Sequence, residues 1–126
     1  MKPITHEWVN KAEGDFATAE RELRAADNPN YDAVCFHAQQ CAEKYLKARL
    51  QEADVAFGKT HDRIALLDLA LKVESSWEIL RADLQSLTLF AVAYRYPGDS
   101  ADEDDARESV TRCRNIRRIV RRALSL

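Results

Sequence analysis

Apolar residues recur at intervals of three and four along most of this chain, and this period constrains the fold more than any other feature. In the first segment the recurring residues are Trp8, Ala12, Phe16, Ala19 and Leu23. In the second they are Val34, Ala38, Cys41, Ala42, Tyr45 and Leu46. Such intervals place side chains on one face of an α-helix. Because the 126 residues include only three glycines and three prolines, the sequence predicts an all-α fold rather than a turn-rich β fold.

Capping residues mark the expected beginnings of the first two helices. We expect Thr5 to cap a first helix that ends near Ala26, where "DNPN" interrupts the pattern. We expect Asn30 to cap a second helix that ends near Ala53.

Three further helices are expected in the second half of the chain. We expect Thr60 to cap a short third helix that ends near Ser75. Residues 77–96 form the fourth helix, and its apolar character on all sides suggests that it is the most buried. Ser100 and Glu103 have the spacing of a capping box for the fifth. Short connections favour antiparallel neighbours, so we predict an up-and-down bundle of four main helices plus the shorter third one, in a single domain over residues 1–126.

Composition and charge exclude several classes of protein and site. The formal net charge is −2, which gives no overall basicity to attract nucleic acid, and no apolar run approaches the length of a membrane span. The chain starts without an apolar signal region and has an odd number of cysteines, so we expect a cytoplasmic setting. Cys35, Cys41 and Cys113 lack metal-ligand spacing, and we expect them to fill the core, with no metal or cofactor.

Basic residues and tyrosines are expected to meet at one end of the bundle. If the third and fourth helices form an antiparallel hairpin, "KTHD" at the start of one lies beside "YRYP" at the close of the other, with the end of the second helix next to both. The residues brought together would be Lys47, Gln51, Lys59, His61 and Arg95.

This expected end has the chemistry of an anion site. Free N–H groups at the start of the third helix, with Lys59 and Arg95, favour a phosphate. Tyr94 and Tyr96 offer stacking surface for a base. The alternative is structural: Thr60 only caps a helix, His61 is solvated, and Arg95 extends beside a tyrosine.

Two histidines and a stripe of arginines have alternative interpretations. His61 could act as an acid or base in RNA cleavage with a nearby arginine, whereas His37 fits an ordinary surface or interface residue. The last helix carries Arg114, Arg117, Arg118, Arg121 and Arg122 within one arc. This basic stripe is either a contact for RNA or an acidic partner, or, as we favour, the solvated face of an amphipathic helix.

The order of "FHAQQCAEKYLKARL", "KTHD" and "YRYP", after an initial pattern of Trp8, Ala12, Asp15 and Ala19, resembles the HEPN domain family over nearly the whole chain. The resemblance implies a homodimeric helical bundle that acts on nucleotides or RNA, often beside a small nucleotidyltransferase. Many relatives are toxin ribonucleases with an Arg-x(4–6)-His motif. That motif is absent here, because none of His6, His37 and His61 follows an arginine at this distance.

The chain therefore resembles the HEPN type that lacks the ribonuclease motif. The positions that match the family are Gln40, Glu43, Lys44, Lys47, Lys59, His61, Asp62, Arg95, Tyr96 and Pro97. From them we expect a nucleotide-binding set of Lys44, Lys47, Lys59, His61, Arg95 and Tyr96.

Three functions follow from these observations. The favoured one is a dimeric, non-catalytic module that binds a nucleotide or RNA and works with a nucleotidyltransferase partner in a toxin–antitoxin-like system. The second is a metal-independent ribonuclease that uses His61 and Arg95. The third is a helical adaptor in which Glu43, Lys59 and Arg95 form only internal or interfacial ion pairs.

Overall fold

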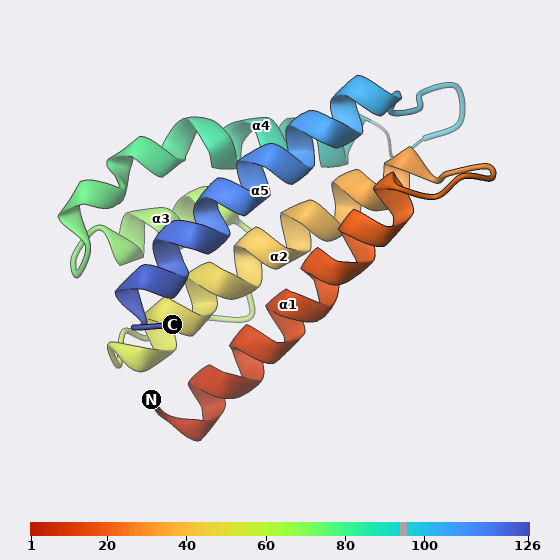
Figure 1. The fold of residues 1–126 in the computed structure, drawn as a ribbon. Coiled ribbons are helices and arrows are strands. Elements are labelled where there is room, and N and C mark those ends of the chain that lie inside the picture. Colours follow the sequence, from red (N-terminus) through yellow and green to blue (C-terminus); the bar gives the residue numbers. More distant parts are fainter. Residues whose placement is uncertain (94–95) are drawn as a thin grey trace.

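The computed structural model describes residues 1–93 and 96–126, with side chains left out of the description at 91–93. Its described residues form five α-helices and one 3₁₀ helix, with no strand (Figure 1). These elements are α1 (Pro3–Leu23), α2 (Tyr31–Glu52), α3 (Arg63–Ala70), η1 (Ser75–Leu80), α4 (Arg81–Ala93) and α5 (Glu103–Ala123). The predicted all-α bundle is confirmed.

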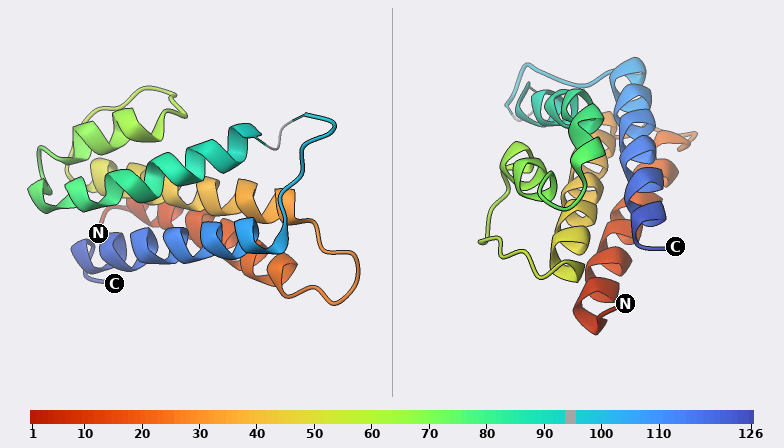
Figure 2. Two further views of the ribbon diagram at one scale, coloured as in Figure 1. Left: turned by 90° about the horizontal axis from the view of Figure 1, so that it is seen from above. Right: turned by 90° about the vertical axis from the view of Figure 1, so that its left-hand side faces the viewer.

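Helix α2 lies in the centre of the bundle. It packs against α1, α3, α4 and α5, and its buried residues include Tyr45, Leu46 and Leu50. Both ends of the chain lie at one end of the bundle, and the α1–α2 loop lies at the other (Figures 1 and 2). The expectation that the fourth helix is the most buried was wrong, since α4 covers one side of α2 and exposes 65% of Leu89.

Three of the four expected helix caps differ from those observed. Asn30 caps α2 as predicted, and its side chain accepts a hydrogen bond from Ala33 N at 3.0 Å. Thr5 does not cap α1, which begins at Pro3 because proline is well suited to the first turn. Thr5 is instead buried, and its hydroxyl donates to Glu52 Oε1 at 2.9 Å.

The start of α5 is shifted from Ser100 to Asp102. Asp102 Oδ1 accepts from Asp105 N at 2.8 Å, and Asp105 Oδ2 accepts from Asp102 N at 3.1 Å. This reciprocal pair satisfies two N–H groups and places negative charge at the positive end of the helix dipole.

The third and fourth predicted helices are shorter than the apolar pattern indicated. Asp62, not Thr60, caps α3, because its carboxylate accepts from both Ile64 N and Ala65 N, at 3.1 and 3.0 Å. The fourth segment opens as the 3₁₀ helix η1, in which Trp77 and Leu80 are both buried. A period of three places these two residues on one face, which an apolar count does not separate from α-helix.

The short α3 changes which residues meet. Because α3 has only eight residues, its first residue, Arg63, lies beside the middle of α4, where Arg63 Nε donates to Thr88 Oγ1 at 3.1 Å. Tyr96 lies in the segment after α4 that leads to Ala101. Ala101 contacts Asp32 in the first turn of α2. The expectation that the ends of the second and fourth helices meet was therefore wrong.

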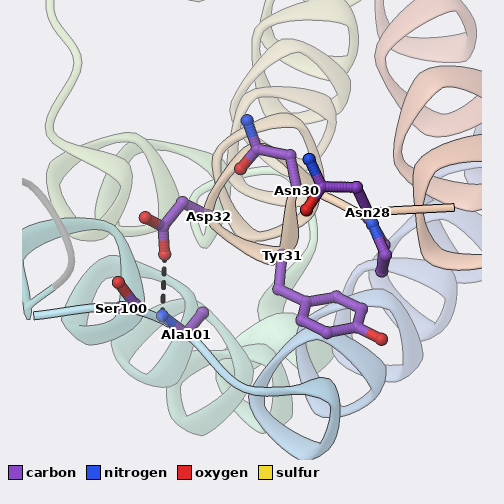
Figure 3. Close-up of a pocket in the computed structure, with 7 residues that line it drawn as sticks. Asn28, Asn30, Tyr31, Asp32, Ser100 and Ala101 are labelled. Carbon is purple, nitrogen blue, oxygen red and sulfur yellow. Dashed lines mark hydrogen bonds between the residues drawn. The ribbon is translucent and has the colours of Figure 1, made fainter.

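Figure 3 shows the contact that holds this other end of the bundle. Asp32 Oδ1, in the first turn of α2, accepts from the backbone N–H of Ala101 at 2.7 Å. A shallow pocket of about 290 Å³ surrounds this contact and is lined by Asn28, Pro29, Asn30, Tyr31, Asp32, Ser100 and Ala101. It joins the two loops that precede α2 and α5.

The three cysteines fill the core, as predicted. Cys35, Cys41 and Cys113 are buried free thiols. Two effects raise the pKa of Cys41: first a hydrogen bond with Cys113, and second burial. Burial also raises the pKa of Cys35. Across residues 1–93 and 96–126, no group of three or more metal-ligating side chains comes together, and no helix is long and apolar enough to cross a membrane.

Candidate functional site

The end of α2 turns the chain into a loop that forms one wall of a cleft. Asp54 adopts a left-handed conformation with φ of 57°, and Val55 N donates back to Leu50 O at 3.0 Å. Asp54 N donates to Gln51 O in the same turn, so the Leu50 and Gln51 carbonyls near the end of the helix are satisfied. Lys2 also pairs with the Asp54 carboxylate and ties the loop to the start of α1.

The cleft lies under this loop, between α1, α2 and the approach to α3. It has a volume of about 470 Å³ and is lined by Trp8, Lys47, Phe57, Gly58, Lys59 and His61. We call it the α2–α3 cleft. Its volume lies within the range of small-molecule sites in proteins.

Two aromatic rings form the apolar part of the α2–α3 cleft. Trp8 of α1 and Phe57 of the loop meet edge to face, with ring centroids 6.1 Å apart. Lys47 Nζ lies 5.3 Å from the centroid of the Trp8 ring, within the range of a cation–π contact. A planar ligand therefore has aromatic surface from two elements, α1 and the loop after α2, along the cleft.

Beneath the cleft, Glu43 gathers three basic side chains. Its carboxylate accepts from Arg63 Nη1 at 2.9 Å and from Lys47 Nζ at 3.2 Å, and lies 3.0 Å from His61 Nδ1. The Glu43 side chain is only 2% exposed. Such burial is tolerated because Arg63 and Lys47 compensate the negative charge.

Arg63 is held by further contacts on its buried side. Its Nε donates to Thr88, and the amide oxygen of Gln39, in the orientation that satisfies both groups, accepts from Nη1 and Nη2 at 2.8 and 3.1 Å. These bonds join α2, α3 and α4. We call Glu43, Lys47, His61 and Arg63 the Glu43 cluster.

The arrangement can bind an anion beside an aromatic group. His61 is 79% exposed, and Glu43 holds its Nδ1, so the ring is anchored while its other edge stays at the surface. Lys59 is exposed at the rim and has no ion-pair partner among the described residues. Together they present two polar groups next to the Trp8 and Phe57 rings.

The structure brings together only part of the predicted nucleotide-binding set. Lys47, Lys59 and His61 line the same cleft, as the sequence suggested. Tyr96 is 65% exposed and follows α4 at the other end of the bundle. Arg95 and its neighbour Tyr94 lie outside the described residues.

Lys44 belongs to a different cluster. Its Nζ lies 2.5 Å from Asp15 Oδ2, and His37 Nδ1 lies 2.8 Å from Asp15 Oδ1. These contacts fix α2 against α1, away from the residues that line the α2–α3 cleft. His37 is therefore partly buried at a helix–helix contact.

The backbone N–H groups at the start of α3 are also engaged differently from our expectation. Asp62 accepts hydrogen bonds from the second and third of them, so they are occupied within the chain. Gln51 lines a different pocket of about 380 Å³, which shares Trp8 and Phe57 with the α2–α3 cleft. The cations of the cleft, and not the α3 amides, carry its anion-binding capacity.

Sequence reasoning missed three residues of the site. Trp8 was assigned to the apolar face of the first helix, although it is only half-buried. Phe57 stands in the loop "DVAFGK", where no helical period assigns it to a face. Arg63 gave no signal, because its partner Glu43 lies twenty positions away.

Comparisons with known proteins give one consistent result. A model of the HEPN domain matches residues 5–123. The crystal structure of an archaeal HEPN homologue is similar to this chain, with a TM-score of 0.68 and 26% sequence identity. The alignment covers 96% of this chain and 97% of the archaeal one. A comparison with curated proteins gave no match.

Proposed function

Because this chain belongs to the HEPN domain family, we propose that it is a non-catalytic module that binds a nucleotide or an RNA end in the α2–α3 cleft. The observation that carries the proposal is the joint placement of two aromatic rings and two exposed polar groups around one cleft of about 470 Å³. Nucleotides combine a flat base with an anionic phosphate, and this cleft offers a partner to each.

The division of roles follows from the contacts. Trp8 and Phe57 provide stacking surface for the base, and Lys59 and His61 reach the phosphate at the rim. Lys47 contacts both the Trp8 ring and Glu43, so it connects the base side of the cleft to the buried cluster. Arg95 lies outside the described residues, and Tyr96, at the other end of the bundle, is not assigned to this cleft.

We further propose that the module is a homodimer that works with a nucleotidyltransferase partner in a toxin–antitoxin-like system. This part rests on the family resemblance and on apolar side chains exposed at the surface, among them Phe36 and Leu89 at 51% and 65%. Light scattering at about 50 μM, well above common dimer dissociation constants, tests the homodimer. A monomer at this concentration would contradict it.

Nucleotide binding is tested by isothermal titration calorimetry, in which the protein is titrated separately with AMP, ATP and a 5′-phosphorylated RNA hexamer. Lys59→Ala removes one charged contact and is expected to weaken binding about tenfold, which corresponds to about 1.4 kcal/mol. Lys72→Ala is the matched control, because Lys72 is an exposed lysine after α3 that lies outside the cleft. Absence of saturable binding, or equal affinities in both variants, would refute the proposed site.

A cleavage assay distinguishes the ribonuclease alternative from the binding module. A labelled RNA is incubated with the protein at neutral pH in the presence of a metal chelator. We expect no cleavage above background, because His61 without the family's arginine motif supplies only part of the stabilisation that the transition state needs. Fragments that disappear in both His61→Ala and Arg95→Ala would establish the enzyme instead.

A further inference from the structure

The five arginines of the basic stripe on α5 fall into two groups, one that pairs with carboxylates of α1 and one that does not. Arg117 donates to both carboxylate oxygens of Glu13 at 2.7 and 2.6 Å, Arg121 lies 3.3 Å from the same group, and Arg114 pairs with Glu20 at 3.0 Å. These three arginines fasten α5 to α1. The other two, Arg118 and Arg122, are exposed and pair with no carboxylate in the described part of the chain.

Arg118 and Arg122 border a groove between η1 and the last turns of α5. The groove has a volume of about 410 Å³ and is lined by Glu74, Ser76, Trp77, Ile79, Arg118, Ile119, Arg122 and Ala123. We call it the η1–α5 groove. Trp77 is buried, Ile119 and Ala123 are half-buried, and Ile79 is 70% exposed, so the floor and one rim are apolar.

The charges of the groove are not balanced within the chain. Glu74 is the acidic residue in its lining, and Arg49 Nε already donates to that carboxylate at 2.9 Å. Within the described residues, the side-chain hydrogen bond of Arg118 goes to the side-chain oxygen of Asn115, at 2.6 Å. Arg118 and Arg122 are four positions apart and are therefore neighbours on the surface of α5. Two guanidinium groups are available to one carboxylate at the edge of an apolar groove.

We propose that the η1–α5 groove is a docking site for a peptide segment of a partner protein in which an acidic residue lies next to a large apolar residue. The apolar side chain fills the space over Trp77 and Ile119 and covers Ile79, which would otherwise remain in water. The carboxylate binds Arg118 and Arg122, which gives the contact its direction and its charge specificity.

A peptide fits this groove better than a nucleic acid. Beside the wall formed by η1, Glu78 of η1 and Asp68 of α3, each 58% exposed, pair with Arg81 of α4. A polyanion would meet these carboxylates after contacting only two arginines, whereas nucleic-acid affinity grows with the number of phosphates neutralised. The apolar floor also offers nothing to a phosphate backbone.

The experiment is a selection from a random 12-residue peptide display library on the purified wild-type protein, with depletion on Arg118→Gln/Arg122→Gln. We expect enriched peptides to share an Asp or Glu adjacent to Leu, Ile, Phe or Trp. The affinity of a synthetic enriched peptide is then measured by fluorescence anisotropy. Arg118→Gln/Arg122→Gln is expected to weaken it at least tenfold, and Ile79→Ser at least threefold.

Arg107→Gln is the matched control, because Arg107 is an exposed arginine of the same helix that pairs with Glu103 at its other end. It should leave peptide affinity unchanged, and circular dichroism confirms that each variant is folded. Three results would overturn the proposal: no enrichment of acidic–apolar peptides, equal weakening by Arg107→Gln, or binding of a 12-nucleotide RNA that depends on Arg118 and Arg122 without any such peptide.

Discussion

Glu43 and Glu13 each collect several cationic or hydroxyl partners, yet the two carboxylates lie in regions that serve different purposes. Glu43 on α2 contacts Lys47, His61 and Arg63 under the α2–α3 cleft. Glu13 on α1 contacts Arg117 and Arg121 of α5. Tyr45 of α2 also donates to Glu13, at 2.7 Å. The Glu13 contacts therefore join α1, α2 and α5, whereas the Glu43 contacts join α2 to α3 and to the segment before it.

Burial and the neighbouring surface distinguish the two regions. The Glu43 side chain is 2% exposed and lies below an open cleft, so two of its partners, Lys47 and His61, also line that cleft. The Glu13 side chain is 32% exposed, and Arg117 covers the Phe16 ring at 4.7 Å. The same types of residue thus form a support for a ligand site in one place and a closed link between helices in the other.

The largest expected effect is that of Glu43→Gln. The substitution leaves Arg63 and Lys47 buried without a negative charge, and we expect it to lower the free energy of unfolding by about 3–5 kcal/mol. Urea denaturation followed by circular dichroism measures the change. A loss below about 1 kcal/mol would show that water or Gln39 compensates the cations, and the contrast with Glu13 would then fail.

A smaller loss is expected for Glu13→Gln. Arg117 and Arg121 are each 28% exposed and regain solvation when the carboxylate is removed, so we expect a cost of about 1–2 kcal/mol. Glu20→Gln, which removes the more exposed pair with Arg114, serves as the control and should cost at most about 0.5 kcal/mol. If Glu13→Gln cost as much as Glu43→Gln, burial would not be what separates the two clusters.

The Glu13 link should also depend on pH. The hydrogen bond from Arg117 holds the pKa of Glu13 below its ordinary value of 4.5. Between the lowered pKa and 4.5 the unfolded chain binds more protons at this site, so its contribution is present above pH 4.5 and is lost as pH falls through the folded-state pKa. The stability difference between wild type and Glu13→Gln should therefore shrink in acid. A difference that grows below pH 4.5 would contradict this origin.

The secondary structure was predictable where local signals decide it. The apolar period and the Asn30 cap placed α2 correctly because both act within a few residues. Helix α3 was predicted too long, because its apolar run continues past Ala70 into turns that the sequence does not mark with glycine or proline. Because α3 is shorter than predicted, Arg63 lies next to Thr88 in the middle of α4, and the end of α2 does not meet the end of α4.

The candidate site was predictable only in part, for the same reason. Lys59 and His61 were found because a basic, histidine-containing segment before a helix is a local pattern. The pairing of Trp8 with Phe57 joins positions 49 residues apart in the chain, as 8 and 57 indicate, and depends on the turn at Asp54. Lys44 does not line the cleft, and its ammonium group pairs with Asp15 on another helix, which the sequence alone does not indicate.

The smallest effect on stability is expected for His61→Ala, and it is the sharpest test of how the Glu43 cluster differs from the Glu13 link. His61 is 79% exposed, and Glu43 still contacts Arg63 and Lys47 when the imidazole is removed. The free energy of unfolding should therefore change by no more than about 0.5 kcal/mol. If the cleft binds a nucleotide phosphate, the same variant should weaken AMP binding about fivefold or more, since a charged hydrogen bond contributes about 1.5–3 kcal/mol before solvent screening. Arg121→Ala, at the Glu13 link, should give the opposite pattern, with a measurable loss of stability and unchanged AMP affinity. If His61→Ala lowers stability and leaves nucleotide affinity untouched, the Glu43 cluster is a structural link like that of Glu13, and the cleft above it is not the ligand site.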